Sequence, residues 1–236
     1  MAKHIGVKIG NKHSWTHWKL WMLNKPEISP PEPKYMFVDI AGADGSLDLT
    51  ESLTGTVQYE SRKIKMELNL IDRINQWAAI YSEIMNYCHG KSLHITFDDD
   101  IGYYYTGRIS VNQWKSSRLR GIITIEAIVD PYKYEVVASN EPWKWDPFSF
   151  VDGVIRNYSG IEVNGTKEVT VIGSRKELTP VISCSASGMS VTIFGETYPL
   201  ESGRNAIPQI ILTEGEHTWR FSGTGTVEII FRGGSL

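Results

Sequence analysis

Residues 63–70 read KIKMELNL, and the alternation in this stretch decides the fold class. Its apolar residues take every second position: Ile64, Met66, Leu68 and Leu70. Successive side chains of a strand point to opposite faces of a sheet. The stretch therefore predicts an antiparallel strand with one face on a core and the other in solvent. The segments 5–9 and 123–129 alternate in the same way and predict two more strands, the second ending at Asp130-Pro131.

A hairpin is predicted around residues 93–111. Leu93, Ile95 and Phe97 lead into the acidic run 98–100, which Gly102 and a tyrosine-rich second arm follow. Three adjacent aspartates offer oxygen ligands to Ca²⁺, but the run lacks the EF-hand spacing. A solvated hairpin tip is the favoured interpretation of these aspartates.

One segment has a helical period. Between residues 73 and 89, apolar side chains recur at spacings of three and four, which places them on one face of a helix. Asp72 is expected as the N-cap, and Gly90 as the residue just past the C-terminal end. We expect this helix to lie across one face of the sheet.

Four prolines within residues 24–34 predict an extended arm. Proline removes ladder donors and favours solvated, extended backbone. Two interpretations stay open, a plain surface loop and an arm that contacts a neighbouring subunit.

Two domains are expected, residues 1–135 and 136–236, because the pattern of apolar stretches changes near residues 131–150. Beyond that point, short apolar stretches recur with glycine between them, which is typical of a sandwich or jelly roll. The expected strands are 169–171, 181–185, 189–194, 207–213, 217–222 and 226–231. The last two would be joined by a turn at 223–225. Trp219 is expected in the core, and Trp143 and Trp145 between the domains.

Composition excludes several classes of protein. The 236 residues carry a formal net charge of −3, with no basic block of the kind that nucleic-acid-binding proteins use. No apolar run has the roughly 20 residues of a membrane span, and the N-terminus lacks the apolar core of a signal peptide. Cys88 and Cys184 are far apart in sequence and are expected to be reduced, partly buried thiols.

The sequence indicates no catalytic, metal-binding or cofactor-binding residues. His13 and His17 are four apart in what looks like a strand, roughly 13 Å, which is too far for two ligands of one metal. Cys88 and His89 are neighbours on the helix and point in different directions. Nucleophile-elbow, Walker and Rossmann motifs are absent, and no carboxylate pair stands out. We expect a protein that is not an enzyme and that needs no cofactor.

Residues 38–50, VDIAGADGSLDLT, resemble the motif of distal tail proteins of long-tailed bacteriophages and phage-tail-like particles. In that family a strand enters a G-x-D-G turn and a short apolar-acidic strand follows. Tyr59 and Arg62 also fit the pattern, and residues 127–132 resemble the strand end that closes the family's N-terminal domain. Glycine-rich segments at 203–207, 215 and 223–227 resemble its C-terminal galectin-like sandwich.

The resemblance implies a mainly β protein, in which a β-sandwich or barrel-like N-terminal domain with one helix precedes a galectin-like jelly roll. It implies a structural virion protein of the tail tip, synthesised in the bacterial cytoplasm. Six copies would form a baseplate hub ring through which DNA passes, in contact with the tail tube protein, the tail-tip hub protein and receptor-binding proteins. The sequence does not indicate which residues make these interfaces.

Two other functions remain open. The first is a carbohydrate-binding module for host cell-wall polysaccharide, with Trp143, Trp145 and Tyr198 as a stacking platform. The second is a cell-wall hydrolase, which the missing catalytic constellation disfavours.

Overall fold

The computed structural model describes residues 5–70, 76–116, 121–142 and 154–236. It is mainly β, as predicted, with two helices in the described part of the chain. The chain divides into two compact units. One comprises residues 1–99, 105–131 and Leu236, and the other comprises 100–104 and 132–235. Among the helices that the structure describes, none has the length and hydropathy needed to cross a bilayer.

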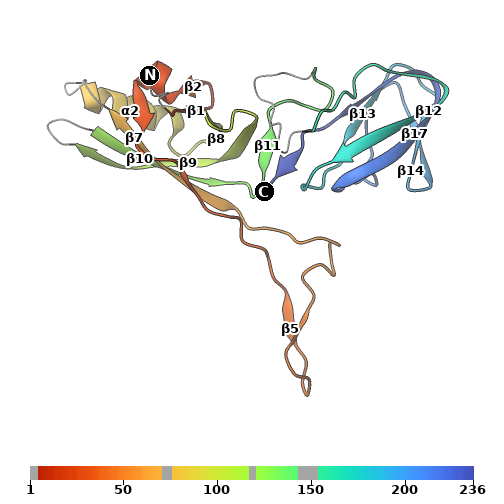
Figure 1. The fold of residues 1–236 in the computed structure, drawn as a ribbon, viewed down its shortest axis with the longest axis horizontal. Helices are drawn as coiled ribbons and strands as arrows, with labels where there is room; N and C mark the ends of the chain where they lie inside the picture. The colour runs from red at the N-terminus through yellow and green to blue at the C-terminus, as the bar shows by residue number, and fades with distance from the viewer. Residues whose placement is uncertain (1–4, 71–75, 117–120, 143–153) are drawn as a thin grey trace. The chain divides into compact units, whose positions relative to one another are not determined.

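The first unit is built on one curled antiparallel sheet (Figure 1). Its strands, in spatial order, are β2 (Lys12–His13), β1 (Val7–Ile9), β8 (Ser92–Phe97), β9 (Tyr103–Ser116), β10 (Gly121–Val129), β7 (Arg62–Leu70) and β3 (Leu20–Met22). A short strand, β4 (Glu27–Ile28), also pairs with β7.

Strand β7 confirms the alternation in the sequence. Ile64, Met66 and Leu68 are at most 1% exposed and lie in the core, whereas Lys63 faces solvent. Strand β10 places Ile125 and Ala127 in the same core, in register with Met66 and Ile64 of β7. Burying apolar surface contributes roughly 25 cal/mol of stability per Å², so this continuous core makes the largest contribution to the stability of the unit.

The predicted helix is α2 (Trp77–Cys88), and its apolar face packs into the same core. Gly90 follows it with φ +75°, as expected. The expected N-cap Asp72 lies outside the described residues. A second, short helix, α1 (Ser14–Trp18), corrects the strand predicted around His13 and His17. His13 caps this helix, because its Nδ1 accepts the Trp15 N–H at 3.2 Å.

The hairpin of β8 and β9 is confirmed, but its tip is not simply solvated. Asp98 accepts the Gly6 N–H at 2.9 Å and lies 3.0 Å from His13 Nε2. Asp100 pairs with Lys133 at 2.8 Å. Two of the three aspartates therefore hold local structure.

The second unit is a β-sandwich with its own core. Its main sheet runs β15 (Glu196–Leu200), β14 (Met189–Ile193), β17 (Gly215–Ile230), β13 (Val181–Cys184) and β16 (Gly203–Ala206), and β12 (Ile161–Gly173) also pairs with β17. Two further strands, β11 (Lys133–Glu135) and β18 (Gly234–Ser235), pair with each other. Trp219 is 1% exposed in this core, as predicted.

Two predictions for this unit were wrong. Residues 207–213 form no strand, and β16 precedes them. The predicted strands 217–222 and 226–231, apart from Phe231, form the single strand β17. Its pairing with β12 continues without a break from Gly173–Gly215 to Ile161–Val227. Gly223 does not turn the chain. A Cβ there would meet Met189 at 3.0 Å, so the glycine allows close packing.

A buried ion pair fixes the start of the second unit. Arg156 Nη1 donates to both carboxylate oxygens of Glu135, at 2.7 and 2.6 Å. The guanidinium also donates to the Ile172 carbonyl at 3.1 Å and lies over the Phe231 ring. A charge-assisted hydrogen bond of this kind is stronger than one between neutral groups.

Candidate assembly arm

The most unusual feature of the first unit is an isolated two-stranded ribbon, residues 29–61, which we call the arm (Figure 1). It begins where β4 pairs with β7 and Ser29 donates its N–H to the Lys63 carbonyl at 2.9 Å. A bridge between Pro33 and Tyr59 continues the ribbon. Its outer part is the hairpin of β5 (Phe37–Asp39) and β6 (Ser46–Asp48).

Local sequence explains the end of the arm. Gly42 and Gly45 have φ of +85° and +75°, a conformation that glycine adopts without strain. Ser46 Oγ donates to Asp39 at 2.6 Å and ties the two strands together. The motif of residues 38–50 therefore folds as predicted, as a strand, a turn and a second strand.

The ribbon has one wholly apolar face. Val38 and Leu47 are cross-strand partners, and Met36 and Ile40 share their face because they are two residues from Val38. These four side chains are between 39% and 50% exposed. They belong to neither hydrophobic core, so four neighbouring apolar side chains are left partly in solvent.

The opposite face combines aromatic and acidic side chains. Tyr35 and Phe37 stack with ring centroids 5.7 Å apart and are 66% and 58% exposed. Asp39 and Asp48 lie on the same face through the cross-strand register. The Thr50 hydroxyl and N–H both donate to Asp48 and lower the pKa of its carboxyl. Asp48 therefore stays charged to lower pH than an ordinary aspartate.

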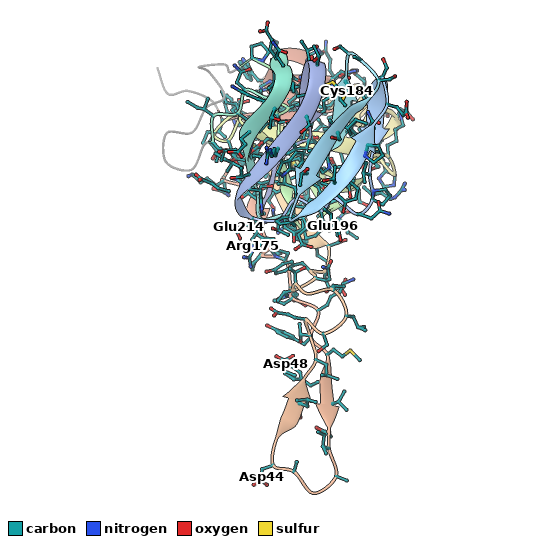
Figure 2. The ribbon with its side chains drawn as sticks, turned by 90° about the vertical axis from the view of Figure 1, so that its right-hand side faces the viewer. Asp44, Asp48, Arg175, Cys184, Glu196 and Glu214 are labelled. Carbon is teal, nitrogen blue, oxygen red and sulfur yellow. The ribbon has the colours of Figure 1, made fainter. Side chains whose placement is uncertain are left out.

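A two-stranded hairpin without a partner is marginally stable in water, and unpaired apolar strands are hazards that proteins normally cover. This arm leaves two faces uncovered, one apolar and one aromatic and acidic. In Figure 2 the labelled Asp44 and Asp48 point away from the ribbon into solvent. The arm thus has the properties of a surface that binds another protein chain.

The sequence located this region but not its extent. The predicted arm, residues 24–34, is only one side of the ribbon, and the structure joins it to the motif of residues 38–50. Tyr59 lies at the base of the ribbon, and the guanidinium of Arg62 is buried over the Tyr105 ring. Burial lowers the pKa of Arg62. The sequence assigned no interface to residues 35–48, because apolar side chains at every second position of a strand, such as Met36, Val38 and Ile40, are also typical of a strand that packs on its own core.

The other candidate groups do not converge. His17 Nδ1 accepts the His13 N–H at 3.0 Å, so both histidines serve α1. Within the described ranges, no three His, Cys, Asp or Glu side chains are placed to share a metal ion. Cys88 and Cys184 are buried free thiols, and burial raises the pKa of Cys88 to about 11. The solvent-facing side of β7, β9 and β10 has a hollow of about 440 Å³ lined by two lysines and two glutamates among neutral residues.

The expected sugar platform is only partly visible. Tyr198 is half-buried and donates its hydroxyl to Glu196 at 2.5 Å, and this contact raises the pKa of the phenol. Trp143 and Trp145 lie outside the described residues. Among its described residues, the second unit offers no observation that favours carbohydrate binding.

Comparison with solved structures identifies the fold. The structure of SPP1 Dit, described as a paradigm of the hub adsorption apparatus of phages that infect Gram-positive bacteria, superposes with a TM-score of 0.62 at 14% sequence identity. The match covers 99% of this chain and 100% of SPP1 Dit. The chain has the distal tail protein fold. No protein-family model matches the sequence, and no curated protein matches it significantly. The distal tail fold is thus recognised through structure, over nearly the whole chain.

Proposed function

We propose that this protein is a structural subunit of a phage tail tip, which joins further copies of itself into a ring between the tail tube and the tail-tip hub. The observation that carries the proposal is the exposed arm, with its uncovered apolar face of Met36, Val38, Ile40 and Leu47. The fold shared with SPP1 Dit supports the same role. A ring of six copies and contacts with receptor-binding proteins belong to the proposal, as does a location in the virion.

The arm suits such a role because a closed ring needs a surface on one copy that fits a different surface on the next. An arm that extends beyond its own core can supply one half of such a contact. The proposed role is binding and not catalysis. Purified protein should release no soluble fragments from bacterial cell walls, and turnover that a single carboxylate substitution abolishes would contradict this.

Arm removal tests the proposal. Lys34 donates its N–H to the Gln58 carbonyl at 2.8 Å, so these residues face each other across the ribbon. Replacing residues 35–57 by Asn-Gly would close the hairpin there with a favoured two-residue turn. We expect the shortened protein to stay folded and to be missing from assembled tails, as seen by electron microscopy and mass spectrometry of the particles.

The matched control replaces Ala41 and Ala43, two exposed residues of the arm tip, by serine, which leaves both faces and every charge of the ribbon in place. This variant should enter tails as the unaltered protein does. Normal tails built with the shortened arm would overturn the assignment of the arm.

A further inference from the structure

The first unit separates its charges along the chain. Residues 5–25 contain four lysines and no aspartate or glutamate. Residues 35–61 contain five acidic residues and no lysine, arginine or histidine. The whole chain has a net charge of −3, so everything outside residues 35–61 sums to +2. Such an asymmetry indicates two surfaces that attract each other.

The basic segment, residues 5–25, also presents aromatic side chains. Trp15 and Trp21 stack at 6.0 Å between ring centroids, and both are half-buried. Lys19 places its ammonium 5.5 Å from the Trp15 ring centroid. Lys19 also has φ +58°, a conformation that costs roughly 1–2 kcal/mol for a residue other than glycine.

The charges of both surfaces are largely unpaired within the described part of the chain. Lys8 and Lys19 are exposed and have no carboxylate within ion-pair distance there. Asp44 and Glu51 of the arm likewise have no cationic partner among the described residues. Lys12, in contrast, pairs with Glu83 at 2.6 Å.

Lys19 precedes β3, so it lies at the end of β7 that is far from the arm. β3 of the basic segment pairs with the Leu70 end of β7, from Leu70 to Leu68. The arm begins at the other end, beside Lys63. The strand between Arg62 and Leu70 spans about 26 Å at 3.3 Å per residue. Because Lys19 and the start of the arm are this far apart along β7, contact between the arm and the basic segment is favoured between different copies over contact within one copy.

We infer that the arm of one copy docks on the basic segment of a second copy. The inference rests on the proposed function and names the partner surface of the arm. Carboxylates of the arm lie against Lys8 and Lys19, and the stacked Tyr35 and Phe37 lie against the Trp15–Trp21 pair. Aromatic anchors supply most of the binding free energy in such interfaces, and the charges select the partner and the register.

Charge reversal of the full-length protein tests this docking. An arm variant, Asp44→Lys with Glu51→Lys, and a segment variant, Lys8→Glu with Lys19→Glu, each place like charges together. Sedimentation velocity at low salt should show self-association at least about tenfold weaker in each variant than in the unaltered protein. Mixing the two variants should restore association, because each arm then meets a segment of opposite charge.

The matched control is Glu162→Lys with Glu168→Lys, two exposed carboxylates of β12. It changes the net charge as the arm variant does, and self-association should be unchanged by it. Added salt should weaken association of the unaltered protein, since exposed charges are screened beyond about 8 Å at 0.15 M. Equal association of arm variant and control, no recovery on mixing, or a protein that stays monomeric at low salt would each overturn the docking. Incorporation of the unaltered protein into tails would still support the proposed function in those cases.

Discussion

Phe194 occupies the position in the hairpin of β14 and β15 where a bulky residue is least expected. Its φ is +52°, that of the next residue, Gly195, is +86°, and its side chain is 73% exposed. Two residues in succession with positive φ are typical of a type I′ turn, for which Asn-Gly is the favoured sequence. The ring makes an edge contact with His217, 5.5 Å between centroids.

Replacing Phe194 by asparagine should therefore stabilise the protein. Relief of the left-handed strain is worth about 1 kcal/mol, and a gain of this size raises Tm by roughly 4–8 °C in a domain of this size. Differential scanning calorimetry of the two proteins measures the shift. Phe194→Ala is the control, because alanine removes the ring and keeps the strain, and it should bring no gain. A lower Tm for the asparagine variant would show that the ring stabilises the turn.

The buried thiol of Cys88 makes stability depend on alkaline pH. Burial raises its pKa from the ordinary 9.0 to about 11, and its Sγ donates to the Ile84 carbonyl at 3.1 Å. The folded protein thus holds the thiol proton more tightly than the unfolded chain. This contribution is complete below pH 9 and is lost as the pH rises towards 11.

Urea unfolding at pH 8, 9, 10 and 11 checks this dependence in a Cys184→Ala background, which removes the second thiol. We expect the free energy of unfolding to fall between pH 9 and 11. The same series with Cys88→Ala should fall less over that interval, because alanine has no proton to lose. Equal slopes in both series would contradict a raised pKa for Cys88.

At the scale of elements, prediction succeeded where a local pattern had one physical cause. The period of two in residues 63–70 and the period of three to four in α2 each follow from burying one face. The motif of residues 38–50 gave its turn correctly because glycine is needed there. Prediction failed at Gly223, where the same residue type serves close packing against Met189, a distant residue that no local pattern reveals.

The arm shows a second limit of prediction from sequence. Val38 and Ile40 occupy every second position on one face of the hairpin, as the apolar residues of β7 do, and Leu47 shares that face, yet all three lie outside both cores. Apolar residues at every second position identify a strand face that is stable only when buried. They do not show whether the same chain or another chain buries it. The sequence therefore predicted the strands of the arm and not the exposure that makes it a candidate interface.

The contact between Glu135 and Arg156 is the element-scale interaction with the largest predicted effect. Arg156→Met would leave the Glu135 carboxylate, whose side chain is 20% exposed, without its cation. We expect the free energy of unfolding of the second unit to fall by about 2–4 kcal/mol, since an uncompensated buried charge is costly. The double variant with Glu135→Gln should regain part of the loss, as measured by urea unfolding. A loss in the double variant as large as that of Arg156→Met would assign the effect to packing over Phe231.

At the scale of the whole molecule, the two hydrophobic cores share no residue. All buried members of the first core lie between residues 7 and 129, and those of the second lie between 158 and 231. The residues of each core form one continuous cluster, and they all belong to one unit. A chain with two separate cores can lose one of them without losing the other.

Residues 132–236 should consequently fold when expressed alone. This fragment retains the second core, the ion pair of Glu135 with Arg156 and the pairing of β11 with β18. It loses residues 100–104 of the second unit. With them go the pairing of Tyr134 and Glu135 with the first residues of β9, the ion pair of Lys133 with Asp100, and the hydrogen bond from the Val136 N–H to the Gly102 carbonyl. A fall in Tm is therefore expected. Circular dichroism and dispersed amide resonances in a two-dimensional NMR spectrum measure folding. Extending the start to residue 100 through a short linker would supply those residues of β9 and should recover the lost stability. A fragment that stays unfolded in both forms would show that the second core depends on the first unit.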